Sequence, residues 1–232
     1  MKEELFQIND TPTLLLGEQT DRLYLFIHGQ QGNKFEARAF AELACPRGWQ
    51  VLAIDLPEHG QRQDGKKLLP WDVLPELQAV LAFAGRNWSR LALRANSIGA
   101  WFSMLAFPPE QIEQYLFVSP ILDMVRLIET MMGWAAVTEE QLQRAGEIAT
   151  DFGQTLSWPY LCFAREHQPR VGYGRTAILY GEQDELTPQV VLEQFARENG
   201  CESRVMAGGE HWFHTPEQLA FLDAWEEEHI LA

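Results

Sequence analysis

Three segments of the chain carry side chains whose types could together perform nucleophilic chemistry. Ser97 lies in the string ANSIG, Asp184 ends the string GEQD, and His211 ends the string AGGEH. A serine hydroxyl becomes a nucleophile when an imidazole takes its proton, and a carboxylate holds that imidazole in the required tautomer. These residue types therefore predict nucleophilic attack on a carbonyl carbon, provided that the fold brings them together.

The serine stands where a predicted strand meets a predicted helix. Residues 91–94 suit a buried strand, and the helix stops at Pro108-Pro109. Its apolar positions recur at helical spacing: Ile98, Trp101, Phe102 and Leu105. A tight turn there points the Ser97 hydroxyl at solvent and sets the unpaired N–H groups of a helix N-terminus beside it. Those groups would stabilise a developing oxyanion.

The elbow differs from the usual G-x-S-x-G pattern at its first small residue. Strand and helix pass so closely in such a turn that positions two before and two after the serine have little room for a Cβ. Here Ala95 replaces the first glycine, and Gly99 keeps the second. Five residues alone do not separate this turn from an ordinary strand-to-helix turn, so the rest of the site must decide.

The elements that must position these residues alternate between strand and helix. Strands are expected at residues 22–28, 50–54, 114–118, 176–180 and 203–206, with helices at 35–44 and 70–88 and an edge hairpin within 6–17. This alternation predicts right-handed crossovers and a doubly wound, mostly parallel α/β sheet covered on both faces. Asp184 and His211 each follow a predicted strand, where the catalytic groups of such sheets lie.

One connection is too long for an ordinary crossover. We expect residues 119–174 to form a helical lid inserted into a single domain that spans residues 1–232. Helices are predicted at 121–134 and 138–152, and the segment Thr138-Glu139-Glu140-Gln141 is a capping box for the second.

In these features the chain resembles the α/β-hydrolase fold family, in particular its small lidded bacterial serine esterases. The resemblance rests on H-G-x-x-G at 28–32, the ANSIG elbow, Y-G-x-x-D ending at Asp184 and G-x-H ending at His211. It implies that Ser97 is the nucleophile, that His211 is the general base and then the general acid, and that Asp184 orients the imidazole. It also implies an oxyanion hole made of the backbone N–H groups of Gln30 and Ile98.

The predicted function is a carboxylesterase-like serine hydrolase that acts on a small substrate and needs no cofactor. The fold and the triad do not determine which type of bond is cleaved, so the alternatives of a thioesterase, an amidase and a C–C bond hydrolase remain. A ligand-binding relative without turnover is a further alternative. Asp123 competes with Asp184 for the role of the acid, because it follows the strand at 114–118.

Several aromatic and methionine side chains of the expected lid are candidates for a substrate pocket. We expect Met131, Trp134 and Trp158 of the lid, together with Trp212 next to His211, to line it, although side chains of this kind also simply pack. Arg94 is unusual, because a charge in a central strand must find a partner. We expect a structural ion pair with an acid below the site.

Composition limits the partners. The 33 acidic and 18 basic residues give a net charge of −15, which argues against nucleic acid and anionic membranes. Residues 1–10 lack the features of a signal peptide, and no apolar run is long enough to span a membrane, so a cytoplasmic location is expected.

The cysteines and histidines give no sign of a metal or redox centre. Cys45, Cys162 and Cys201 are far apart, so we expect free thiols. His211 and His214 lack an accompanying carboxylate cluster, so no metal is expected. Monomer and homodimer are equally compatible with the sequence.

Overall fold

A computed structural model describes residues 1–171 and 175–232 of the chain. The strands are β1 (Glu3–Ile8), β2 (Thr11–Leu16), β3 (Arg22–Ile27), β4 (Gln50–Ile54), β5 (Arg90–Asn96), β6 (Gln114–Val118), β7 (Glu147–Ala149), β8 (Thr155–Ser157), β9 (Arg175–Gly181) and β10 (Glu202–Met206). Eight of them form one sheet in the order β1-β2-β4-β3-β5-β6-β9-β10. From β4 to β10 every neighbouring pair is parallel, as the alternation of elements predicts.

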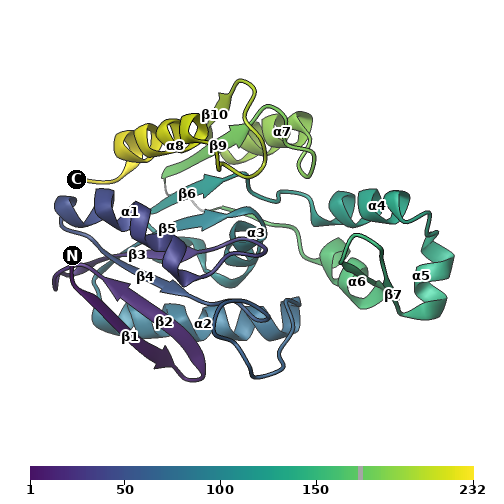
Figure 1. Cartoon of the computed structure of the whole chain (residues 1–232), viewed down its shortest axis with the longest axis horizontal. Helices are drawn as coiled ribbons and strands as arrows, with labels where there is room; N and C mark the ends of the chain where they lie inside the picture. Colours follow the sequence, from purple (N-terminus) through teal and green to yellow (C-terminus); the bar gives the residue numbers. More distant parts are fainter. Residues whose placement is uncertain (172–174) are drawn as a thin grey trace.

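Helices flank this sheet on both faces (Figure 1). They are α1 (Ala37–Ala44), α2 (Pro70–Asn87), α3 (Ser97–Ala106), α4 (Met124–Trp134), α5 (Glu139–Ala145), α6 (Trp158–Glu166), α7 (Gln189–Asn199) and α8 (Pro216–His229), with 3-10 turns at Lys34–Glu36, Cys45–Arg47 and Pro109–Gln111. Within the two described ranges, no helix combines the length and the apolar character needed to cross a membrane.

Two apolar cores account for the doubly wound arrangement. On one face, Phe40 of α1 and Trp225 of α8 pack with alternate residues of the strands. On the other face, Leu77 of α2, Phe102 of α3 and Leu192 of α7 do the same. Because both faces are covered, every residue of β4 and β6 is buried, and all but the first residue of each strand are apolar.

The predicted edge hairpin is confirmed. Strands β1 and β2 pair antiparallel through a turn in which Asn9 has a positive φ of 53°. Asparagine tolerates this left-handed conformation better than most residues. Strand β2 also pairs antiparallel with β4, which makes this edge the antiparallel part of an otherwise parallel sheet.

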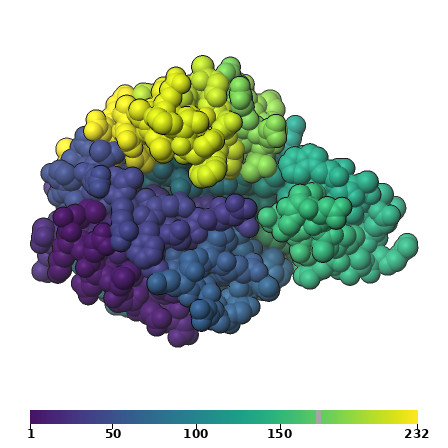
Figure 2. Space-filling model, in the orientation of Figure 1, coloured from purple at the N-terminus to yellow at the C-terminus, as the bar shows by residue number. Residues whose placement is uncertain are grey.

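The long connection between β6 and β9 carries α4, α5, the small β7–β8 hairpin and α6. These elements form a lobe that projects beside the main body, seen in green at the right of Figure 2. The predicted insertion extends to residue 174, and its last three residues, 172–174, lie outside the described residues.

The boundaries of the inserted helices differ from those predicted. The helix predicted at 121–134 begins at Met124, because the Asp123 side chain caps it by accepting from the Arg126 N–H. The helix predicted at 138–152 is wrong beyond Ala145, since Gly146 at φ 78° ends it and the β7–β8 hairpin follows. Its capping box at Thr138 is present.

Candidate active site

Ser97 occupies a strained turn between β5 and α3. Its φ of 47° is rare for a residue with a side chain, and strain of this kind is typical of functional sites. A Cβ on Gly99 would lie 2.2 Å from the His28 carbonyl oxygen, so no larger residue fits there. Ala95 is completely buried, and the crossing accommodates the methyl group that departs from the usual pattern.

The three predicted residues lie in one hydrogen-bonded series. Ser97 Oγ is 2.8 Å from His211 Nε2, and His211 Nδ1 is 2.7 Å from Asp184 Oδ2. The other carboxylate oxygen of Asp184 accepts from the backbone N–H groups of Leu186 and Thr187, at 2.8 and 3.1 Å. The aspartate is thus held from one side while it faces the imidazole from the other.

The end of β9 packs directly on the loop that follows β10, which sets this geometry. A Cβ on Gly181, the last residue of β9, would lie 2.3 Å from the Glu210 carbonyl oxygen, so the aspartate and histidine loops touch through their backbones. The Tyr180 hydroxyl donates to the Thr187 carbonyl at 2.7 Å, and the Thr187 hydroxyl donates to the Pro120 carbonyl. Burial raises the pKa of Tyr180 to about 12, so it remains a donor.

The alternative acid lies elsewhere. Asp123 accepts from the Arg126 N–H at 2.9 Å as the cap of α4, whereas Asp184 faces the His211 ring. A carboxylate committed to a helix N-terminus is not placed to orient that imidazole. The geometry therefore favours Asp184.

The loop after β3 passes over the serine. A Cβ on Gly29 would lie 3.1 Å from Ser97 Cβ, and Gln30, Ile98 and Ser97 all line one cavity. Ile98 is in the first turn of α3, where backbone N–H groups have no intrahelical acceptor. Both residues predicted to supply oxyanion donors thus line the cavity together with the serine.

His28 supports this loop from below. It is completely buried, its Nε2 accepts from the Leu56 N–H at 3.0 Å, and its Nδ1 donates to the Gly29 carbonyl at 2.7 Å. Burial lowers its pKa to about 4, so the ring stays neutral at pH 7 and keeps both bonds. His28 therefore supports the loop structurally rather than by titrating at neutral pH.

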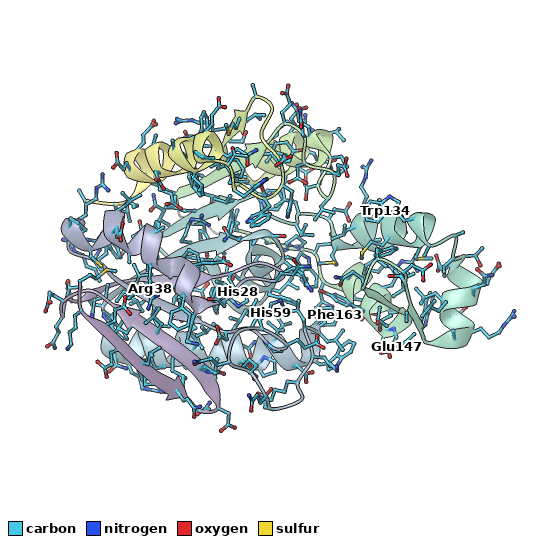
Figure 3. All side chains as sticks on the ribbon, viewed as in Figure 1. His28, Arg38, His59, Trp134, Glu147 and Phe163 are labelled. Atoms are coloured by element: carbon cyan, nitrogen blue, oxygen red, sulfur yellow. The ribbon has the colours of Figure 1, made fainter. Side chains whose placement is uncertain are left out.

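His59 holds the same loop from the neighbouring strand end, a contact that the sequence does not reveal. Its Nδ1 donates to the Pro57 carbonyl at 2.7 Å, and its Nε2 accepts from the Gln31 N–H at 2.8 Å. The ring centroids of His28 and His59 are 5.2 Å apart, and Figure 3 shows the two side chains together. Since Gln31 has a φ of 63°, this acceptor stabilises a conformation that few residues adopt unaided.

Replacing His59 with phenylalanine is expected to lower turnover about tenfold, less than the loss of about a hundredfold or more that follows deletion of an oxyanion donor. The ring still fills its space, but the Gln31 N–H loses its acceptor and the loop loosens. Steady-state kinetics with His59→Gln, which retains an acceptor, should show partial recovery. His167→Phe, an exposed ring on the inserted lobe, is the matched control. Unchanged turnover in His59→Phe would contradict the proposal that His59 stabilises the loop.

A cavity of about 870 Å³ opens at the serine. Much of its apolar lining comes from the inserted lobe, including one face of α4: Met124, Leu127, Ile128, Met131, Trp134, Phe152, Leu156 and Tyr160. The Trp134 and Phe152 rings meet edge to face at 5.9 Å, and both are about half exposed. The cavity is large enough for a drug-sized molecule.

Of the predicted pocket residues, Met131 and Trp134 line this cavity, whereas Trp158 and Trp212 do not. Trp158 begins α6 and packs against the apolar core. Trp212 is 73% exposed and stacks on His214, with ring centroids 4.7 Å apart. The position of Trp212 next to His211 in the sequence does not indicate that it lines the cavity, because the direction of its side chain depends on the conformation of the turn.

Three charged side chains line the cavity and were not predicted: Glu58, Lys67 and Glu147. Lys67 Nζ donates to Glu58 Oε1 at 3.0 Å. This hydrogen bond raises the pKa of Lys67, and the charge of Glu147 raises it further by a smaller amount. Glu147 lies on the inserted lobe, as Figure 3 shows. These side chains together give the lining a net charge of −1.

No cation site accompanies these residues. In residues 1–171 and 175–232, no group of three or more histidine, cysteine, aspartate or glutamate side chains is arranged to hold a metal ion. His211 and His214 do not form such a group, and His214 instead lies 3.3 Å from Glu210.

No protein-family model matches the sequence. No curated protein matches it either. Solved structures, however, match almost the whole chain. Est1E from Butyrivibrio proteoclasticus with bound ferulic acid has a TM-score of 0.78 at 19% identity, over 97% of this chain and 96% of that one. Mouse alpha/beta hydrolase domain-containing protein 10 has 0.76 at 15%, over 98% of each chain. The thioesterase domain of the curacin biosynthetic pathway has 0.62 at 17%, over 97% and 99%.

Proposed function

We propose that this chain, which has the α/β-hydrolase fold, is a serine hydrolase that cleaves an ester-like bond of a small substrate through an acyl-enzyme. The observation that carries the proposal is the hydrogen-bonded series from Ser97 through His211 to Asp184, which ends at a cavity open to the serine. Similarity to hydrolases and esterases of the same fold supports the reaction class.

In the first half of the reaction, Ser97 Oγ attacks the carbonyl carbon while His211 Nε2 accepts its proton across the 2.8 Å contact. The proton makes the imidazole cationic, and Asp184 stabilises that charge at Nδ1. Because the carboxylate also accepts two backbone N–H groups, it stays in place as the imidazole gains and loses its proton.

The tetrahedral intermediate carries its negative charge on the former carbonyl oxygen. The backbone N–H groups of Gln30 and Ile98 donate to that oxygen, and the N-terminus of α3 adds a favourable dipole. Collapse of the intermediate breaks the bond to the leaving group, which takes the proton from His211. Water then attacks the acyl-enzyme with His211 as base, and the Ser97 hydroxyl is restored as the acid leaves.

The cavity supports a neutral, partly apolar substrate. The face of α4 offers methionine and branched aliphatic side chains to an acyl group. The charged part of the lining, with Glu58, Glu147 and one paired lysine, disfavours anionic groups. This counts against a polyanionic thioester carrier as substrate, although a thioesterase domain shares the fold.

We further propose that the inserted lobe acts as a lid over a single domain. It supplies most of the apolar wall of the cavity, while Ser97, Asp184 and His211 all come from the strand ends of the sheet. The three free cysteines are consistent with a protein located in a reducing compartment such as the cytoplasm.

Covalent labelling tests the proposal. Incubation with a fluorophosphonate probe should add one adduct to the intact protein, and peptide mapping should place it on Ser97. Activated serines react because the adjacent base removes the proton, so His211→Ala should abolish the adduct. Wild-type protein that stays unlabelled beside a reactive control esterase would exclude the activated serine.

A substrate panel separates the remaining reactions of this site. We expect turnover of neutral p-nitrophenyl esters, with slower turnover of acyl thioesters on an anionic carrier because of the acidic lining. An exclusive preference for thioesters would overturn the ester assignment. Labelling without turnover of any ester, amide or thioester would point to a binding protein.

A further inference from the structure

A row of apolar side chains runs along α4 and lines the cavity from one end of the helix to the other. Its members recur at i, i+3, i+4, i+7 and i+10, a spacing that places them on one face of a helix. We call this row the α4 stripe, and it consists of Met124, Leu127, Ile128, Met131 and Trp134. Because the cavity touches every member, it follows the helix along its length.

The inner end of the α4 stripe is fixed beside the proposed nucleophile. The backbone N–H of Ile121, just before α4 begins, donates to the Ser97 carbonyl oxygen at 3.2 Å, and Ile121 lines the same cavity. From there α4 runs out of the main body into the inserted lobe (Figure 1). The stripe therefore starts near the serine and leads away from it.

The outer end of the α4 stripe leaves apolar surface uncovered. Met124 and Ile128 are each 4% exposed, whereas Trp134 is 53% exposed. Phe152, which meets Trp134 edge to face, is 41% exposed and also lines the cavity. Covering apolar surface is favourable in proportion to its area. A ligand that extends from the serine to these two rings would therefore gain free energy that a short ligand does not.

The position of His211 indicates which part of an ester lies in the cavity. The leaving group takes its proton from His211, so it must lie on the side of the imidazole. His211 is 21% exposed but is not among the residues that line this cavity, whereas Ser97 is. The part of the substrate that stays bonded to Ser97 is the acyl group. The cavity therefore suits the acyl group, and the leaving group lies on the exposed side of the imidazole.

The length of the α4 stripe limits the acyl chain that it fits. With a rise of about 1.5 Å per residue, Met124 and Trp134 are about 15 Å apart along the helix axis. An extended alkyl chain with bonds of about 1.5 Å advances about 1.3 Å per bond, so about ten to twelve carbons span the stripe. A chain of that length ends at the Trp134 and Phe152 rings.

We propose that the α4 stripe binds the acyl chain of a medium-chain ester, and that Trp134 contacts the far end of the chain and sets its preferred length. The inference rests on the proposed function, since it assumes that Ser97 forms the acyl-enzyme. It names the acyl group of the substrate, which the hydrogen-bonded series of Ser97, His211 and Asp184 does not determine.

A series of p-nitrophenyl esters from butyrate to myristate tests this proposal. For the wild type, kcat/KM should rise about two- to fourfold with each added methylene as far as decanoate or dodecanoate, because a buried methylene contributes a factor of that size. It should rise no further at myristate, whose chain extends beyond Trp134. A flat profile, or one that falls from butyrate onwards, would overturn the proposal.

Removing the outer ring should weaken the preference for long chains. In Trp134→Ala, the ratio of kcat/KM for decanoate to that for butyrate should fall about tenfold, roughly the contribution of two buried methylenes. Trp71→Ala is the matched control, because it removes a tryptophan of α2 that is 46% exposed and does not line this cavity. An unchanged ratio in Trp134→Ala would show that the ring does not contact the acyl chain.

Blocking the α4 stripe partway tests the length relation itself. Met131 lies three residues before Trp134, so Met131→Trp places a large ring about 4.5 Å closer to the serine along the helix. The preferred acyl chain should then shorten by about three to four carbons. An unchanged optimum would contradict the proposal.

Alkyl acetates separate the two ends of the ester. A chain-length preference that appears with alkyl acetates instead of acyl esters would place the alcohol along α4 and refute the acyl assignment. Absence of any Ser97 adduct in wild-type protein treated with the fluorophosphonate probe would instead refute the proposed function itself, so the two failures are distinguishable.

Discussion

Replacing Ser97 with alanine is expected to lower kcat/KM by about four to six orders of magnitude and to abolish the fluorophosphonate adduct. The hydroxyl is the atom that forms the acyl bond, and no neighbouring side chain replaces it. The structure also offers a matched control: Ser103, on the same helix, donates to the Gly99 carbonyl at 2.7 Å and is completely buried. Ser103→Ala should retain activity within a few-fold, as measured with a p-nitrophenyl ester.

Combining Ser97→Ala with His211→Ala gives a sharper version of this result. Residues that act as one unit show little further loss when the second is removed, so the double variant should match Ser97→Ala. Losses that multiplied would mean that the two residues work independently, despite their 2.8 Å contact.

Lys34→Met is expected to lower the free energy of unfolding by about 3–5 kcal/mol, because it leaves a buried carboxylate without its counter-charge. Lys34 and Asp55 are completely buried, and Lys34 Nζ donates to Asp55 Oδ2 at 2.6 Å. Urea unfolding followed by circular dichroism would measure the change. Arg38→Met, which breaks an exposed pair with Glu3, should cost no more than about 1 kcal/mol. A similar small change in Lys34→Met would contradict the expected role.

The pH dependence of this difference follows from Asp55. Burial alone would raise the pKa of its carboxyl group, but hydrogen bonds from Lys34 and from the Gln61 N–H outweigh it and leave the pKa below its ordinary value. The stability gained from the ionised carboxylate is therefore complete above a pH of about 4 and is lost as the pH falls below that value. Wild type and Lys34→Met should converge in stability under acid.

The sheet was predictable because its strands are buried on both faces. β4 and β6 match their predicted bounds, since in each a glutamine is followed by four apolar residues, and such a run has few other stable arrangements. Strand order was not available in the same way, because it depends on contacts between residues far apart in the chain.

The inserted lobe was harder to predict from local patterns. The predicted length of α5 is wrong because Gly146 ends the helix. A glycine within an apolar pattern does not by itself indicate that a hairpin follows. The hairpin β7–β8 has strands of only three residues, too short for a period-two signal, and α6 was not predicted as a helix.

Some features of the candidate site could be predicted from the sequence, and others could not. Ser97, Asp184 and His211 were accessible from sequence because strand ends of a parallel sheet meet at one edge, and the structure places the three in contact. The bond from Gln31 to His59 and the choice of Glu226 as the ion-pair partner of Arg94, at 2.6 Å, depend on side-chain directions, which spacing does not specify. For the same reason Trp212 could not be separated from true lining residues.

The proposed catalytic residues and much of the apolar cavity lining lie on different parts of the chain, and this separation affects how substrate selectivity can change by mutation. The groups proposed for bond cleavage come from loops anchored in β3, β5, β9 and β10, while much of the apolar wall comes from α4, β8 and α6 within one continuous segment. Mutations accumulating in that segment can therefore alter which molecules are accepted without disturbing the reaction itself. Exchanging the segment between relatives becomes a route to new selectivity, in nature or by recombination in the laboratory.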